Sequence, residues 1–127
     1  MTKLSPSLTR LRKICLSLPD AEEGTAWGHP VFRVAGRMFC VYEEIKGTWT
    51  VGFKMAPLHA MLREGDPRIV AAQNLGKHRW LFMDAARIRD WDEVRNAIVE
   101  SYRLAAPKRS LAKLSAAPTP PMARRWR

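Results

Sequence analysis

The sequence predicts one α+β domain, in which an antiparallel β-sheet is covered on one face by the N-terminal and C-terminal helices. Two observations predict this class: the strand-like segments follow one another through tight turns, and helical patterns lie before and after them. Consecutive strands joined by turns pair antiparallel, and flanking helices bury the apolar face of the sheet. A chain of 127 residues with 46% hydrophobic residues can build one such core. The expected order is helix, three strands, helix, strand, helix.

The first helix is predicted from residue 6 to about residue 17. Its apolar residues recur at helical spacing, and they are Leu8, Leu11, Ile14, Cys15 and Leu18. Ser5-Pro6 supplies an N-cap followed by a proline at the first helical position, and Pro19 ends the helix. Residues 21–29 contain two glycines and two acids and are interpreted as a connector.

Three strands are predicted after residue 30. Residues 31–34 and 37–42 are rich in valine and aromatic residues, and the Ala35-Gly36 reversal between them is typical of a hairpin. A third strand follows the Lys46-Gly47 turn. In it Trp49, Val51 and Phe53 alternate with Thr50, Gly52 and Lys54. This alternation predicts one apolar face and one open face.

The second half of the chain predicts two more helices and one strand. Pro57 can start a short helix, and Asp66-Pro67 predicts another short turn through residue 70. Residues 80–83 are apolar and aromatic, which favours a fourth strand. The final helix is predicted over residues 90–106, with Asp90 and Glu93 in capping-box positions.

The domain is expected to span residues 1–106, with a flexible basic tail over residues 107–127. The tail contains a proline-rich stretch typical of extended linkers and no acidic residue. Its basic residues are Lys108, Arg109, Lys113, Arg124, Arg125 and Arg127. Since these supply six of the ten net positive charges, the domain itself carries only +4.

Several functional classes have no support in the sequence. Cys15 and Cys40 lie among apolar residues and outside any metal-binding spacing, so we expect reduced core cysteines. No apolar run could span a bilayer and no signal peptide is recognisable, which favours the cytoplasm. The histidines are far apart, and neither a nucleophile motif nor a nucleotide-binding loop occurs. We therefore expect a non-enzymatic protein without a cofactor or metal.

Residues 27–39, Trp-Gly-His-Pro-Val-Phe-Arg-Val-Ala-Gly-Arg-Met-Phe, resemble the MmcQ/YjbR family. Lys54, the stretch 77–80 and the stretch 101–104 extend the resemblance to roughly residues 8–110. The resemblance implies a small CyaY-like (frataxin-like) α+β fold and a DNA-binding role, with no catalytic residue to carry over. A frataxin-like shape raises iron binding, but the first helix carries basic residues where a carboxylate ridge is needed.

Nucleic acid is the partner that the charge and the resemblance favour. Basic side chains neutralise phosphates and release counterions. The candidate residues within the domain are Arg37, Lys54, Lys77, His78 and Arg79. We expect weak, salt-dependent binding in which the six basic tail residues dominate. The alternative is that Arg37 and Lys54 lie on a solvent-exposed sheet face without binding a partner, and that the tail only increases solubility.

The sequence is also compatible with a second function, the binding of a protein segment or a small ligand. The open sheet face, or a pocket near Trp27 and His29, could receive a protein segment or a small ligand. His29 as a general base is less favoured than His29 as a structural residue.

Overall fold

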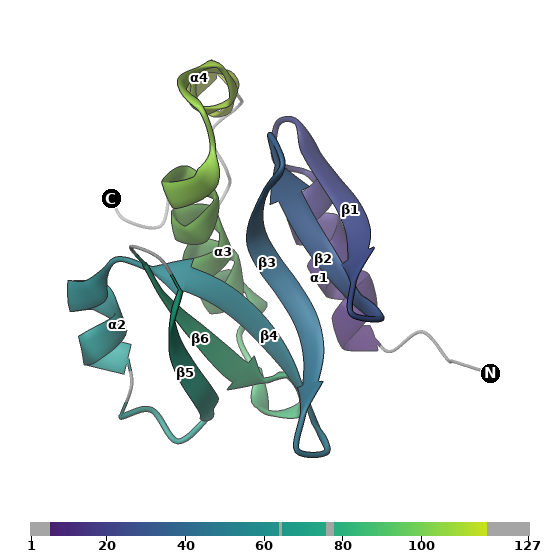
Figure 1. Ribbon diagram of the computed structural model, residues 1–127, viewed down its shortest axis with the longest axis vertical. Helices are drawn as coiled ribbons and strands as arrows, with labels where there is room; N and C mark the ends of the chain where they lie inside the picture. The colour runs from purple at the N-terminus through teal and green to yellow at the C-terminus, as the bar shows by residue number, and fades with distance from the viewer. Residues whose placement is uncertain (1–5, 64, 76–77, 117–127) are drawn as a thin grey trace.

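The computed structural model describes residues 6–63, 65–75 and 78–116 (Figure 1). Its elements in chain order are α1 (Pro6–Leu16), β1 (Ala21–Ala26), β2 (His29–Val34), β3 (Arg37–Ile45), β4 (Thr48–Met55), α2 (Pro57–Arg63), β5 (Ile69–Leu75), β6 (His78–Asp84), the 3-10 helix η1 (Ala85–Arg87), α3 (Trp91–Ala105) and α4 (Lys108–Ala116). None of the helices within these described ranges is long and apolar enough to cross a membrane.

The described strands form one six-stranded sheet in the order β1-β2-β3-β4-β6-β5, and every neighbouring pair is antiparallel. The predicted α+β class is confirmed, as are the strands that became β2, β3, β4 and β6. Ala35-Gly36 and Lys46-Gly47 form the expected hairpin turns, and all four residues have positive φ. Two successive positive φ values match the twist of the paired strands, which explains the glycine in each turn.

The segment expected to be a connector is instead the edge strand β1. Its sequence, Ala-Glu-Glu-Gly-Thr-Ala, has no apolar alternation, yet all six residues pair with β2. Glu23 lies on the helix side, where its carboxylate accepts hydrogen bonds of 2.9 to 3.1 Å from Arg12 of α1. Tertiary pairing therefore overrides weak strand propensity here.

The turn expected after Asp66-Pro67 leads directly into a second missed strand, β5. The Asp66 carboxylate accepts a hydrogen bond from the backbone N–H of Arg68, and β5 begins at Ile69. A bulge between Ile69 and Ala71 shifts the register of β5 against β6. The sheet is therefore wider by one strand at each edge than the sequence predicts.

Helix α3 agrees with its prediction, but one capping residue has another role. The Asp90 side chain caps the helix by accepting from the N–H of Asp92. Glu93 instead accepts hydrogen bonds of 3.0 and 2.9 Å from Arg68, so it links α3 to the start of β5.

The folded part continues past the expected boundary at residue 106. Residues 108–116, expected to belong to a flexible tail, form α4, and Leu111 and Leu114 pack against the core. The Ser110 hydroxyl and the Lys113 ammonium both donate to Asp20, at 2.7 and 2.9 Å. The remainder of the expected tail, residues 117–127, lies outside the described residues.

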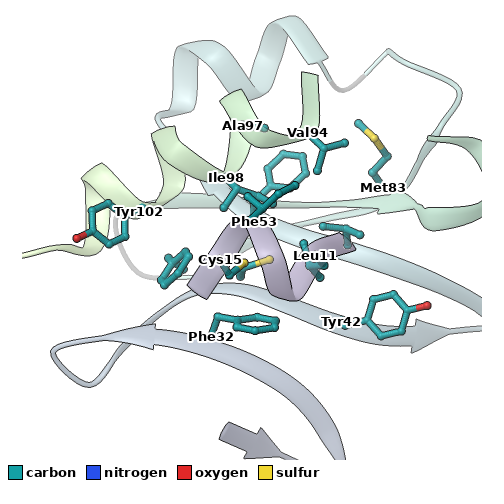
Figure 2. Close-up of a cluster of buried hydrophobic side chains, with 14 of the residues drawn as sticks. Leu11, Cys15, Phe32, Tyr42, Phe53, Met83, Val94, Ala97, Ile98 and Tyr102 are labelled. Carbon is teal, nitrogen blue, oxygen red and sulfur yellow. The ribbon is translucent and has the colours of Figure 1, made fainter. Parts of the chain in front are cut away.

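The main core lies between the sheet and the helices, which gather on one face (Figure 1). Figure 2 shows Leu11 and Cys15 of α1 and Ile98 of α3 directed toward Phe32 and Phe53 of the sheet. Cys15 and Cys40 are free and buried, as expected, and burial raises the pKa of the Cys15 thiol. The opposite face carries a smaller cluster of buried side chains, Val31, Val41, Trp80 and Phe82.

Arg68 joins two carboxylates between β5 and α3. Its guanidinium lies 2.6 Å from an Asp66 carboxylate oxygen and 2.9 Å from one of Glu93. The hydrogen bonds from Arg68 lower the pKa of Asp66 from 3.8 to about 2. Since the ionised carboxyl is favoured in the folded state, its stabilising contribution is complete above about pH 4 and is lost as the pH falls toward 2.

We therefore expect Asp66→Asn to flatten the loss of thermal stability between pH 4 and pH 2. Melting temperatures measured across this range for the native chain and for Asp66→Asn check this. Glu44→Gln, which removes an exposed carboxylate on β3, is the control and should keep the native pH dependence. Parallel curves for native chain and Asp66→Asn would contradict the prediction.

Candidate nucleic-acid interface

Basic residues of four strands lie at one end of the sheet. Neighbouring strands run antiparallel, so the ends of β2 and β4 lie beside the starts of β3 and β6. We call this the basic end, and its residues are Arg33, Arg37, Lys54, His78 and Arg79. In Figure 1 it lies toward α4, away from the β3–β4 turn. Four of the predicted candidates are thus brought together, whereas Lys77 lies outside the described residues.

Ser101 of α3 holds the basic end to the helix layer. Its hydroxyl accepts a 2.9 Å hydrogen bond from the backbone N–H of Lys54 and donates a 2.5 Å hydrogen bond to the carbonyl of Phe39. Cys40 pairs with Phe53, so Phe39 and Lys54 follow as the next positions along the two strands. The serine hydroxyl therefore bridges two backbone groups of β3 and β4, and it fixes the backbone that carries Lys54.

Lys54 is half-buried and positively charged without a carboxylate partner. Its Nζ lies 5.6 Å from the centre of the Trp80 ring, which provides a cation–π contact. Burial lowers the pKa of Lys54, and the positive charge of Arg37 lowers it further. Among the described residues, no ion pair joins a carboxylate to Arg33, Arg37 or Lys54. A bound anion would relieve this repulsion between like charges.

The remaining basic side chains differ in whether they form hydrogen bonds or ion pairs within the protein. Arg79 donates a 2.8 Å hydrogen bond to the side-chain oxygen of Asn74, and both His78 and Arg79 make further interactions. On α4, Lys113 pairs with Asp20, while Lys108 and Arg109 are exposed. Arg124, Arg125 and Arg127 lie outside the described residues.

Sequence reasoning overlooked two cations in this region. Arg33 lies on β2 opposite Met38, and Arg103 is exposed on the last turn of α3. Arg33 stands two residues after Val31, so the period-2 pattern of β2 could have placed it on the open face. Arg103 could have been found because the stripe of α3 that includes Ile98 and Tyr102 leaves it on the outer side.

Trp27 and His29 flank Gly28 in the β1–β2 turn, at the opposite end of the sheet from the basic end. The Trp27 side chain is 85% exposed. The His29 ring instead contacts Trp49 edge-on, with 6.3 Å between ring centres, and its Nδ1 is buried without a hydrogen-bond partner. Trp27 and His29 therefore lie apart from the basic end.

The described residues contain no group of three or more His, Cys, Asp or Glu side chains arranged to hold a metal ion. His59 is paired with Glu100 of α3 at 2.7 Å. The aromatic Trp80 is only 4% exposed, so it supports Lys54 rather than offering a free face to a base. The chemistry that this end of the sheet offers is therefore the binding of anions by exposed and half-buried cations.

Comparison with known proteins identifies the family. None of the curated proteins is significantly similar to this chain. The fold is similar to the crystal structure of Deinococcus radiodurans protein DR2400, described with the domain DUF419, with a TM-score of 0.65 and 21% sequence identity over 83% of this chain and 85% of that one. The YjbR family model matches residues 16–104, from the end of α1 into α3. Because this match spans most of the chain, including the whole described sheet, the protein belongs to the YjbR family.

Proposed function

We propose that this protein binds nucleic acid without catalysing a reaction, mainly through contacts to phosphates. The observation that supports this most is the placement of Arg37 and Lys54 on adjoining strand ends, close enough for the charge of Arg37 to lower the pKa of Lys54, and without an ion pair to a carboxylate among the described residues. Cations spread over several strands suit a ligand that carries several phosphates, since each can neutralise a separate one.

Helix α4 extends this surface on the same side of the molecule. Lys108 and Arg109 are exposed, and α4 is docked through Ser110 and Lys113 to the loop between α1 and β1. The cations of α4 are thus held in a fixed position relative to the sheet. Buried Trp80 and Phe82 argue against base stacking beside Lys54, which favours backbone contacts over reading of sequence at this end of the sheet.

The direct test compares two pairs of substitutions that remove equal charge. Arg37→Gln with Lys54→Gln removes two cations of the basic end, and Lys46→Gln with Arg89→Gln removes two exposed cations elsewhere. We expect the first pair to lower the affinity for labelled duplex DNA about tenfold at low salt, and to reduce the slope of log affinity against log salt by about two. Fluorescence anisotropy across a salt series measures both quantities.

The control pair should change affinity much less. Equal loss with both pairs would mean that only the net charge matters, and absence of binding at low salt would overturn the proposal. Replacing Arg124, Arg125 and Arg127 with serine in the full chain measures the contribution of the C-terminal segment. Binding of a small molecule or peptide that persists at high salt would instead favour the alternative function, because salt screens exposed charges more than apolar contacts.

A further inference from the structure

The two edges of the sheet have opposite character. At one edge, β1 carries the exposed acids Glu22 and Glu23, and Glu23 is held by Arg12 of α1. At the other edge, β5 has the sequence Ile-Val-Ala-Ala-Gln-Asn-Leu, with neither charge nor proline. Charged residues, proline and β-bulges are the usual means by which proteins prevent edge strands from pairing with other chains. β1 is protected by charge, whereas β5 has a bulge only at its start, which leaves residues 71–75 regular and uncharged.

The outer side of β5 is unpaired within the described part of the chain, because β5 pairs only with β6. An edge strand presents a row of backbone N–H and C=O groups along its free side. Val70, at the bulge, is 39% exposed, and Gln73 is exposed further along the strand. The edge thus offers both backbone hydrogen bonds and uncharged side chains.

An apolar helix face lies beside this edge. Helix α2 contacts β6, the neighbour of β5, and Figure 1 shows α2 and β5 on the same side of the molecule, away from β1. Ala60 of α2 is buried toward the core and His59 is paired with Glu100 of α3. The remaining face of α2 carries large exposed side chains at helical spacing, namely Leu58 (66%), Met61 (71%) and Leu62 (78%).

We propose that a second copy of this chain covers this surface, with the two β5 strands pairing antiparallel around a two-fold axis and the α2 faces packing beside them. A two-fold axis makes each residue of β5 face another residue of the same strand, so the contact must be self-complementary. β5 meets this condition because an uncharged residue faces an uncharged residue at every position, whereas like charges opposite each other would destabilise the pair.

Charge elsewhere on the protein restricts where two copies can meet. The chain carries a formal net charge of +10, so most orientations bring like charges together. The side chains of β5 and the exposed Leu58, Met61 and Leu62 of α2 are uncharged. On the neighbouring strand β6, the basic residues nearest to this edge are His78 and Arg79, which pair with Leu75 and Asn74. Salt should therefore strengthen self-association by screening the repulsion, whereas it weakens phosphate binding. These opposite salt responses separate the failure of this proposal from the failure of nucleic-acid binding.

The test is sedimentation velocity of the full chain over a range of protein and salt concentrations. We expect a monomer–dimer equilibrium that shifts toward dimer as salt increases. Gln73→Lys should weaken the dimer about tenfold, since it places a charge on each copy at the paired edge. The matched control is Thr25→Lys, an exposed position on the other edge strand, which should leave the equilibrium unchanged. Circular dichroism of both variants verifies that the fold is retained.

Hydrogen exchange provides an independent readout on the native chain. Amides of β5 should exchange more slowly as the protein concentration rises, while those of β1 should not change. If the protein remains monomeric at high protein and salt concentrations, the proposal is wrong. The edge of β5 would then be available to a peptide of another protein. Dimerisation that is equally sensitive to Thr25→Lys and Gln73→Lys, or that leaves β5 exchange unchanged, also overturns it.

Discussion

Replacing Gly52 with alanine is expected to lower the free energy of unfolding by about 1–3 kcal/mol. A Cβ atom at this position would lie 2.6 Å from Cε2 of Phe82 and 2.8 Å from Cγ2 of Val41, which is closer than real contacts allow. Phe82 cannot move aside easily, because its ring is buried and stacked against Trp80 with 6.2 Å between the ring centres. The absence of a side chain at Gly52 is what lets Phe82 lie across β4.

Gly65→Ala is the matched control, because nothing lies within 4 Å of its Cβ position and its φ is not positive. It should be neutral or slightly stabilising, since alanine restricts the unfolded chain more than glycine does. Urea unfolding of both variants measures the difference. Similar stability of Gly52→Ala and Gly65→Ala would show that the open-face cluster adapts to the added methyl group.

The sequence predicted the strands that have their own apolar pattern and missed those that depend on a neighbour. Val31 and Phe32 have high strand propensity, and the strand predicted from them is confirmed as part of β2. Glu22 and Glu23 of β1 have no such pattern, and β1 is extended because it pairs with β2 and because Arg12 of α1 binds Glu23. β5 was missed for a related reason: after Ile69 and Val70 its residues have low strand propensity, and a bulge interrupts the alternation.

The C-terminal helix illustrates a different limit of sequence reasoning. Pro107 and the basic residues after it resemble a linker, and the amphipathic pair Leu111 and Leu114 is too short to stand out. What stabilises α4 is a distant partner, Asp20, which accepts hydrogen bonds from residues about ninety positions away in the chain. The hydrogen bonds from Lys113 and Ser110 lower the pKa of Asp20, which indicates that its ionised form is the one bound.

For the candidate site, the basic residues could be predicted from the sequence, but which of them lie together in the fold could not. The sequence places Arg37 and Lys54 on neighbouring strands, and the antiparallel order brings the start of β3 beside the end of β4. The role of Ser101 could not be inferred, because nothing in the sequence indicates that a helix serine bridges two strands. This contact depends on the packing of α3 across β3 and β4.

Ser101→Ala is expected to lower the free energy of unfolding by about 2–6 kcal/mol, because two backbone groups lose their partner and each costs about 1–3 kcal/mol. These groups are the N–H of Lys54 and the C=O of Phe39, and the serine itself is fully buried. Water cannot easily replace the hydroxyl at this position, so the ends of β3 and β4 should loosen. Chemical denaturation measures the loss, and amide exchange at Lys54 should become faster.

Ser110→Ala is the matched control, since Ser110 is also a buried helix serine that donates one hydrogen bond. Its acceptor, Asp20, keeps the hydrogen bond from Lys113 and remains partly exposed to water, so the loss should be about 1 kcal/mol or less. If Ser101→Ala costs no more than Ser110→Ala, the bridge does not hold the strands together. If it costs more and also weakens nucleic-acid binding, the same hydroxyl that joins β3 to β4 keeps Lys54 in position for a phosphate.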